Sequence, residues 1–405
     1  MNISQTIAAR LALSKHKSFA ALIIRLAWVG VGLSVTVMII AIAIVVGYKK
    51  QITEKVTGFN GEIEVHSTGT SGNFDYVPFD DKDSVQKALK QFAFVKQVGA
   101  VMSRPAILKT ENELEGIVFK GIGAQYDTNY LSAHLVEGSL PKVYDSLHKR
   151  DIIVSKLIAS KLQLHINDQV KIYFINQPLR VIPCKITGLY ETGLEDNDQV
   201  FVIGSLKEMQ RIFAKKQNQI THYEIHCKDL KQIPDYTKTL NQAIPQELYA
   251  ESLMSLNPQI FQWLEYLDQN IIIILSLMAI VACINMITAL LILIIERTNM
   301  IGILKALGSR NQVIKSIFFR HALYILGLGL LTGNLIGIGL AWLQKTFQII
   351  KLDQATYYLS YVPIELNAWH ILLVNLGTII VCSIALLLPI QMVSKIEPVK
   401  AIQFQ

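Results

Sequence analysis

Charged residues are scarce in this chain of 405 residues, because Asp, Glu, Lys and Arg together make up only 17% of it. Soluble globular proteins carry about a quarter. Hydrophobic residues account for 51% of the chain, and the mean hydropathy is +0.37. These values exclude a single water-soluble globular domain. The excess of apolar residues requires surroundings in which water does not compete, and a lipid bilayer provides them.

Motifs of catalysis and nucleotide binding are also missing. The sequence contains no G-x-x-x-x-G-K-[ST], no G-x-S-x-G, no H-E-x-x-H and no C-x-x-C. It therefore lacks a phosphate-binding loop, a serine nucleophile elbow and the common zinc motifs. His222 and His226 share one face of a predicted strand, but two histidines alone make a weak metal site. Cys184 and Cys227 either form a disulfide or are two free buried thiols. We predict a non-enzymatic chain without a cofactor, whose energy comes from a partner.

Four uncharged apolar runs are present instead, at residues 26–47, 271–295, 322–343 and 371–390. Each reaches the length of about 20 residues that a helix needs to cross a bilayer. None contains Asp, Glu, Lys, Arg or His in its interior, which argues against an ion or proton pathway. The first run is too long for a cleaved signal peptide, which indicates a signal anchor. We predict a membrane α-helical fold with four transmembrane helices and a large α+β extracytoplasmic domain, residues 48–270, between helices 1 and 2.

Positive charge collects in three short segments beside these runs. Residues 1–25, 296–321 and 391–405 together hold 11 basic and 2 acidic side chains in a chain of net charge +7. By the positive-inside rule these segments and both termini lie in the cytoplasm. Residues 48–270 and the loop at 344–370 then lie on the opposite, outer side of the membrane. Because the basic residues are juxtamembrane, membrane lipids are the expected partner and nucleic acid is not.

Helical patterns continue beyond the predicted spans. Residues 1–25 predict an amphipathic helix on the inner leaflet. Apolar residues at helical spacing extend the first span to Gly58, a predicted C-cap, and extend the second span back to Pro258. We therefore expect two helical stalks. Within the domain, strands are predicted at 62–66, 98–108, 115–120, 170–175, 180–190 and 223–226, and helices at 83–92, 155–162, 205–213 and 233–243.

Small and polar residues mark the contact faces of the spans. The helix-packing candidates are Gly30, Ser34, Gly329, Gly333, Gly337, Asn285 and Asn334. The glycines of the third span repeat every four residues, a spacing that lets helix backbones approach closely, within this chain or against another protomer. For the two asparagines, which lie at similar depth, we expect a hydrogen bond between helices ahead of a contact to a substrate.

The segment between the second and third spans contains ERTNMIGILKALG, at residues 296–308. It predicts a short amphipathic helix that ends at Gly308, with Met300, Ile301, Leu304 and Leu307 as its apolar stripe. Ser309 and Gln312 predict a capping box that starts the next helix. The helix either rests on lipid headgroups or inserts its apolar side chains into a groove of a soluble partner. The coupling candidates are Glu296, Arg297, Met300, Ile301, Gly302, Leu304, Lys305, Leu307 and Gly308.

This segment resembles the coupling-helix motif of the MacB and FtsX-like superfamily of ABC transporter permeases. Further segments are similar to the lipoprotein-releasing permeases of that superfamily, LolC and LolE. They include IAARLALSKHKSF, GYKKQITEKVTGFNGEIEVHS, IIVSKLIASKLQLHINDQVKIYF, ITGLYETGLEDNDQVFV and IEPVKAIQF. The likeness covers nearly the whole chain. It implies a two-part periplasmic domain, with a porter-like part at about 58–130 and 215–256 and an inserted subdomain at about 131–214.

The resemblance also implies partners and a substrate. The chain would be an ABC permease subunit that pairs with a second permease copy or paralogue and with a separate, LolD-like ATPase. It would take lipoproteins from the inner membrane and pass them to a periplasmic carrier. Gln177, Pro178 and Leu179 are candidate carrier contacts, although their turn is shorter than the hairpin hook of some relatives. Met300 stands where many relatives place an acidic residue. Two alternatives are a MacB-like efflux permease and an FtsX-like scaffold that regulates a cell-wall hydrolase.

Overall fold

The computed structural model of the protein describes residues 19–69, 76–111, 113–142, 150–175, 179–213 and 218–395. These residues form two compact units. The bundle unit holds the described residues up to Lys50, together with 263–351 and 361–395, and the sheet domain holds 51–262 and 352–360. Residues 1–18 of the predicted amphipathic helix and residues 396–405 of the predicted tail lie outside the described residues.

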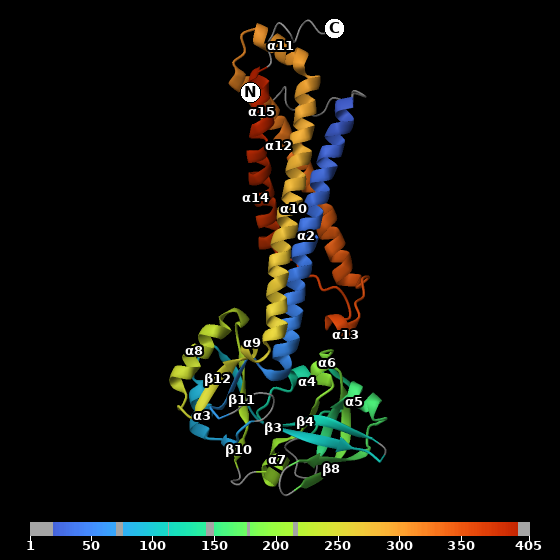
Figure 1. The fold of residues 1–405 in the computed structure, drawn as a ribbon, viewed down its shortest axis with the longest axis vertical. Coiled ribbons are helices and arrows are strands. Elements are labelled where there is room, and N and C mark those ends of the chain that lie inside the picture. The colour runs from blue at the N-terminus through green and yellow to red at the C-terminus, as the bar shows by residue number, and fades with distance from the viewer. Residues whose placement is uncertain are drawn as a thin grey trace. The chain divides into compact units, whose positions relative to one another are not determined.

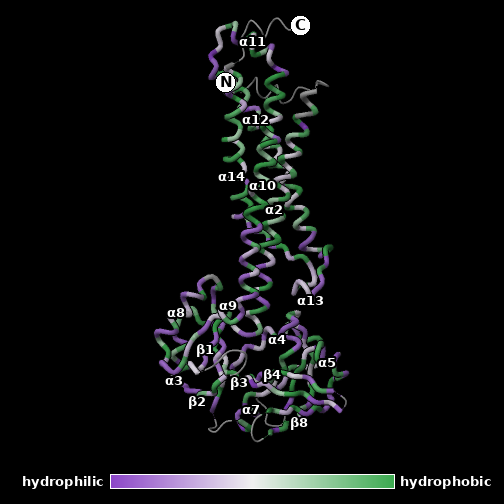
Figure 2. Tube along the Cα trace, viewed as in Figure 1, coloured by the Kyte–Doolittle hydropathy of each residue, from purple (hydrophilic) through white to green (hydrophobic). Residues whose placement is uncertain are grey.

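Long apolar helices make up most of the bundle unit (Figure 1). They are α2 (Phe19–Asn60), α10 (Pro258–Glu296), α12 (Asn311–Phe347) and α14 (Ala368–Ala385), the last followed by α15 (Leu387–Lys395). Among the described residues, four helical stretches are long and apolar enough to cross a membrane. Figure 2 shows hydrophobic residues concentrated along them. The predicted membrane fold with four spans is confirmed.

Glycine and proline decide where two of these helices end. α2 does not end at Gly58, because the residue with left-handed backbone is Gly61, whose φ is 76°. Gly58 instead leaves space for the ring of Tyr130, which a Cβ would meet. The break between α14 and α15 falls at Leu386, shortly before Pro389. Proline has no N–H to donate and its ring crowds the preceding turn, so a continuous helix is disfavoured there.

A mixed sheet, ten-stranded within the described residues, forms the centre of the sheet domain. Its strands are β1 (Ile63–Ser67), β3 (Val95–Lys109), β4 (Leu114–Ile122), β5 (Leu135–Gly138), β6 (Asp151–Ser155), β7 (Gln169–Phe174), β8 (Arg180–Tyr190), β9 (Phe201–Ser205), β11 (His222–Cys227) and β12 (Leu248–Ser252). The order is β12-β1-β11-β3-β4-β9-β6-β8-β5, and β7 pairs with β3 and β8. Only the pairs β4 with β9 and β6 with β8 are parallel among these strands.

Short helices and one further strand pair complete the sheet domain. The helices are α3 (Asp83–Lys90), α4 (Asn129–Ala133), α5 (Lys156–Lys161), α6 (Glu195–Asp198), α7 (Leu206–Phe213), α8 (Ile233–Ala243), α9 (Leu253–Leu256) and α13 (Gln354–Tyr357), and the pair is β2 (Phe79–Asp80) with β10 (Gln219–Ile220). β8 and α8 have the bounds predicted from the sequence. β6 and β9 escaped prediction because they are short, almost entirely buried strands without an apolar–polar alternation.

Part of the loop between α12 and α14 belongs to the sheet domain. Residues 352–360, which include α13, cluster with that unit. The ammonium group of Lys55 donates a hydrogen bond of 2.9 Å to the carbonyl oxygen of Tyr358. Gly193, with φ of 73°, leaves space for the side chains of Lys55 and Gln354. The sequence predicted a plain loop at 344–370 and gave no sign of these contacts.

Candidate functional site

The segment between α10 and α12 contains one short helix, α11 (Thr298–Ala306). Gly308 follows it with φ of 83°, the left-handed conformation that commonly terminates helices. The predicted capping box is wrong, because α12 begins at Asn311 without a side-chain cap. The N–H of Ser309 instead donates back to the carbonyl oxygen of Leu304 at 3.0 Å. The turn therefore closes on α11 and does not cap α12.

α11 is apolar on two sides. Ile301 is fully buried in the apolar core of the bundle unit, and Met300 and Leu304 pack against the same core. Ile303 and Leu307 instead expose 53% and 78% of their surface. The expectation that the stripe is offered to a partner is therefore wrong for Ile301, because its own bundle already covers that side chain. A surface for a partner remains on the opposite side.

We call this side the outer face of α11, and its residues are Asn299, Ile303, Ala306 and Leu307, all exposed and at helical spacing. The other coupling candidates differ in how exposed they are. Glu296 is exposed, whereas Gly302 is buried and Arg297 and Lys305 are half-buried. Lys305 donates a hydrogen bond of 3.2 Å to the carbonyl oxygen of Ser394. This bond joins α11 to α15 and steadies the outer face.

The glycine stripe of α12 lies against α2. A Cβ added to Gly329 would stand 2.7 Å from Cγ1 of Val31, and one added to Gly333 would stand 2.7 Å from the carbonyl oxygen of Gly32. The hydroxyl of Thr36 donates a hydrogen bond of 3.1 Å to the carbonyl oxygen of Gly333. The two backbones can approach this closely only because the stripe has no side chains.

The remaining packing candidates extend this contact and add a second one. A Cβ on Gly337 would stand 3.3 Å from Cα of Thr36, which continues the α12–α2 contact. Gly30 faces α10, where a Cβ would stand 2.5 Å from Nδ2 of Asn285. Ser34 donates to the carbonyl oxygen of Gly30 in its own helix, at 3.0 Å. α2 therefore packs closely against both α10 and α12.

Asn334 pairs with Asn375 of α14. Each side-chain amide donates to the other's oxygen, at 2.6 Å and 2.9 Å, and each also donates to a backbone carbonyl oxygen one turn back. The pair joins α12 to α14. Asn375 was missed in the sequence, where a single asparagine inside an apolar span was the available signal.

An apolar cavity of about 380 Å³, open at the surface of the bundle unit, lies between α2, α10 and α14. Its walls include Met38 and Ile42 of α2, Leu275 and Ala279 of α10, and Leu373 and Val381 of α14. Ser276, His370 and Thr378 are its polar lining residues. A cavity with walls of this kind accepts alkyl chains, since each buried methylene contributes about 0.8 kcal/mol. It offers little to a charged or strongly polar solute.

The predicted carrier-contact turn is described only at its edges, because Gln177 and Pro178 lie outside the described residues. β7 and β8 pair as far as Phe174 opposite Arg180. Ile175 and Leu179 beyond this pair expose 69% and 62% of their surface. The hairpin therefore presents apolar side chains at its end.

Cys184 and Cys227 are free thiols and both are buried in the sheet domain. Burial raises the pKa of each thiol to about 12. The two sulfur atoms are thus protonated and unreactive at neutral pH, which fits side chains that pack a core.

Two family models match the chain. The MacB-like periplasmic core domain matches residues 26–242, and the FtsX-like permease C-terminal model matches residues 272–398. Among known relatives, the lipoprotein-releasing system transmembrane protein LolE of Haemophilus influenzae is 22% identical over 421 residues, which cover 99% of each chain. The corresponding LolC protein of Xylella fastidiosa is 22% identical over 411 residues, which cover 96% of each chain.

Solved structures resemble part of the chain. The periplasmic region of MacB from Actinobacillus actinomycetemcomitans aligns with a TM-score of 0.36 at 13% identity, covering 49% of this chain and 91% of that one. The extracellular domain of the noncanonic ABC-type transporter YknZ from Gram-positive bacteria aligns with a TM-score of 0.33 at 17% identity, covering 47% of this chain and 100% of that one.

Proposed function

The chain belongs to the family of FtsX-like permeases with a MacB-like periplasmic core domain, and we propose that it is the permease subunit of an ABC transporter that releases lipoproteins from the inner membrane. The observation that carries this proposal is the apolar cavity between α2, α10 and α14. Two of its known relatives are named as parts of lipoprotein-releasing systems. An acylated protein is a substrate whose membrane anchor matches such a cavity.

The depth of the cavity supports an outer-leaflet substrate. Met38 and Ile42 lie late in the first span, whereas Leu275 and Leu373 lie early in the second and fourth spans. Because the chain crosses the membrane in alternating directions, these positions share one level, in the half of the bilayer next to residues 48–270. With both termini in the cytoplasm, as the basic segments indicate, that half is the outer leaflet.

The energy source is a separate ATPase, because the sequence has no nucleotide-binding motif. The outer face of α11 is its proposed docking surface. Ile303 and Leu307 supply exposed apolar side chains, and exposed Glu296 lies nearby in the sequence. Such a short helix suits a groove on a soluble partner. Ile301 and Gly302 are buried and hold α11 in position. They therefore affect docking of the ATPase only through the placement of α11.

A movement of α11 can be transmitted along α10, because α10 is one continuous helix of 39 residues, about 58 Å at 1.5 Å per residue. Within the bundle unit α10 is tied to α2 where both leave the predicted spans. The rings of Tyr48 and Trp263 meet edge to face with centroids 5.5 Å apart, and Lys49 pairs with Asp268 at 2.5 Å. We propose that the two helices move as stalks of the periplasmic domain.

Two further partners belong to the proposal. A second permease copy or paralogue would face the exposed apolar sides of the spans, which include Ile273, Ile280 and Ile284 of α10. A periplasmic lipoprotein carrier would contact the β7–β8 hairpin, where Ile175 and Leu179 are exposed. A carrier that shields acyl chains has apolar surface of its own, so apolar side chains suit the contact.

Transfer of labelled lipoprotein from spheroplasts tests this function. We expect release that depends on this chain, on its ATPase partner and on ATP. Release of a small toxic solute without lipoprotein would instead indicate a MacB-like efflux permease. Activation of a cell-wall hydrolase without release of either would indicate an FtsX-like scaffold.

A further inference from the structure

A second cavity, of about 160 Å³, lies inside the sheet domain and is polar. Its lining includes Glu64, Tyr76, Ser103, Lys120, His222 and Glu224. Strand pairing brings these residues together: Glu64 of β1 stands opposite Glu224 of β11, and Ser103 of β3 stands opposite Lys120 of β4. His222 precedes Glu224 by two residues and therefore shares its face of the sheet. The cavity thus lies over four adjacent strands.

Three side chains in this cavity bring metal-binding atoms close together. One carboxylate oxygen each of Glu64 and Glu224 and one ring nitrogen of His222 all lie within 4.8 Å of one another. The three residues expose only 5%, 1% and 2% of their surface, respectively. Buried carboxylates are costly unless a cation or hydrogen-bond donors compensate them. The grouping therefore differs from the exposed acidic clusters found on many protein surfaces.

The two oxygens of Glu224 have different surroundings. Oε1 lies 2.8 Å from Nζ of Lys120 and 3.3 Å from Nε2 of His222. Oε2 is buried and has no hydrogen-bond partner among the described residues. Leaving a buried acceptor unpaired is energetically costly, and more so when it carries charge. An oxygen in this position, on the wall of a cavity, is available to a ligand.

The hydroxyl group of Thr221 holds the imidazole of His222 at its second ring nitrogen, Nδ1. Oγ1 of Thr221 lies 2.9 Å from Nδ1 of His222 and 3.1 Å from the carbonyl oxygen of Val101, and it accepts the N–H of Ser103 at 2.9 Å. When the hydroxyl proton goes to Val101, the hydroxyl oxygen accepts the proton on Nδ1. Nε2 then turns its lone pair toward the two carboxylates. Metal-binding histidines are commonly oriented by such a partner on the second ring nitrogen.

Lys120 supplies a buried ammonium group to the cavity and shares it among Glu224, the carbonyl oxygen of Phe59 at 2.7 Å and Oδ1 of Asn60 at 3.3 Å. Glu64, on another strand, accepts the hydroxyl proton of Tyr76 at 3.0 Å. A bound cation would compensate both buried carboxylates.

We propose that Glu64, His222 and Glu224 bind a divalent transition-metal ion, for which Zn²⁺ is the best match. One imidazole nitrogen and two carboxylate oxygens are a ligand set that Zn²⁺ accepts, and the cavity leaves a fourth position for water. Mg²⁺ and Ca²⁺ require six or more oxygen ligands, and this site offers too few of them. The ion would cross-link β1 to β11. Because Glu224 contacts Lys120, and Lys120 contacts Phe59 and Asn60, the ion would also be linked to the last residues of α2.

The test uses the full chain in detergent, dialysed against a chelator and titrated with Zn²⁺ by calorimetry. We expect about one Zn²⁺ per chain. His222→Gln and Glu64→Gln each weaken the affinity at least tenfold, whereas Mg²⁺ gives no comparable heat. His226→Gln is the matched control, because His226 lies on the same strand and face but pairs with Glu62 at 3.3 Å. It retains wild-type affinity.

Hydrogen exchange provides a readout that does not depend on the folding of one variant. Zn²⁺ is expected to slow amide exchange in β1 and β11 of the wild type and to leave exchange in Glu64→Gln unchanged. If His222→Gln fails to fold, Glu64→Gln alone decides the matter, since glutamine keeps an oxygen that can accept the 3.0 Å hydrogen bond from Tyr76. Absence of Zn²⁺ binding overturns the proposal, as does equal binding by Glu64→Gln and the wild type. Neither result bears on lipoprotein release.

Discussion

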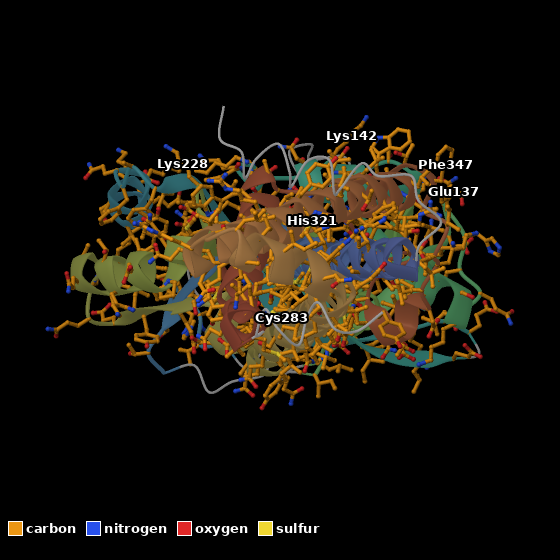
Figure 3. The ribbon with its side chains drawn as sticks, turned by 90° about the horizontal axis from the view of Figure 1, so that it is seen from above. Glu137, Lys142, Lys228, Cys283, His321 and Phe347 are labelled. Carbon is orange, nitrogen blue, oxygen red and sulfur yellow. The ribbon has the colours of Figure 1, made fainter. Side chains whose placement is uncertain are left out.

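The sulfur atoms of Cys283 on α10 and Cys382 on α14 lie 3.8 Å apart inside the bundle unit; Cys283 is labelled in Figure 3. Both helices also supply walls of the apolar cavity. The two thiols therefore report on the spacing of those walls without any engineered residue. A disulfide requires sulfur atoms about 2.05 Å apart, so the two sulfur atoms must move closer for a bond to form.

Oxidation with copper phenanthroline is expected to join Cys283 to Cys382. The protein is then denatured and labelled with a maleimide, and mass spectrometry counts the labels. Of the chain's four cysteines, two are expected to label after oxidation, namely Cys184 and Cys227. The variant Cys382→Ala shows three labels with or without oxidant. Four labels in the oxidised wild type would contradict the packing of α10 against α14.

Substitutions on the two sides of α11 are expected to act differently. Leu307→Asp changes a side chain that is 78% exposed, so it leaves insertion and thermal stability unchanged but abolishes co-purification of the ATPase. Ile301→Asp buries a carboxylate and lowers stability. Gly302→Arg and Leu304→Asp are expected to lose the ATPase together with stability, because both residues face the bundle. Val313→Asp, which alters a side chain 45% exposed at the start of α12, serves as control. Normal ATPase capture by Leu307→Asp would refute the docking surface.

Alanine at Gly333 is expected to destabilise the bundle. Its Cβ would stand 2.7 Å from the carbonyl oxygen of Gly32, and overpacking of this kind costs about 1–3 kcal/mol. Gly339→Ala is the matched control, because nothing lies within 4 Å of a Cβ there; it is neutral or slightly stabilising. Thermal unfolding in detergent, followed by the fluorescence of the chain's four tryptophans, measures both. Equal melting temperatures for the two variants would contradict the α2–α12 contact.

Glu64 is expected to make the sheet domain less stable as the pH rises when no metal is present. Burial raises the pKa of this carboxyl group, so its contribution to stability is complete below the unfolded value of about 4.3. It is lost as the pH rises through the folded value. In chelator, β1 and β11 of the wild type lose exchange protection from pH 4 toward pH 8, after correction for intrinsic rates. Glu64→Gln is expected to remove this pH dependence. Parallel pH profiles of exchange protection in the wild type and in Glu64→Gln would refute the prediction.

Hydropathy and period predicted much of the fold because they record burial directly. The four spans, β8 and α8 follow from runs and alternations that a bilayer or a half-buried strand imposes. Helix ends do not follow from hydropathy, since Gly58 and Gly61 are close in sequence and only backbone geometry shows which one has positive φ. Gly58 is instead required by the ring of Tyr130, a contact between distant residues.

The candidate sites depend on tertiary contacts that the sequence does not encode locally. α11 is apolar on two sides, so its periodicity could not tell that Ile301 is buried and Leu307 exposed. The pairing of Asn334 with Asn375 requires two helices to be in register. The sequence spacing pairs His222 with His226, four residues away, whereas the structure groups it with Glu64 of a different strand.

Reconstituted vesicles test directly whether an ATPase that acts on α11 drives lipoprotein out of the membrane. Permease and ATPase are placed in vesicles with a fluorescent lipoprotein, and its appearance in the aqueous phase is followed after ATP is added. We expect ATP-dependent release by the wild type and by Val313→Asp, and none by Leu307→Asp. Release without ATP, or full release by Leu307→Asp, would contradict this expectation.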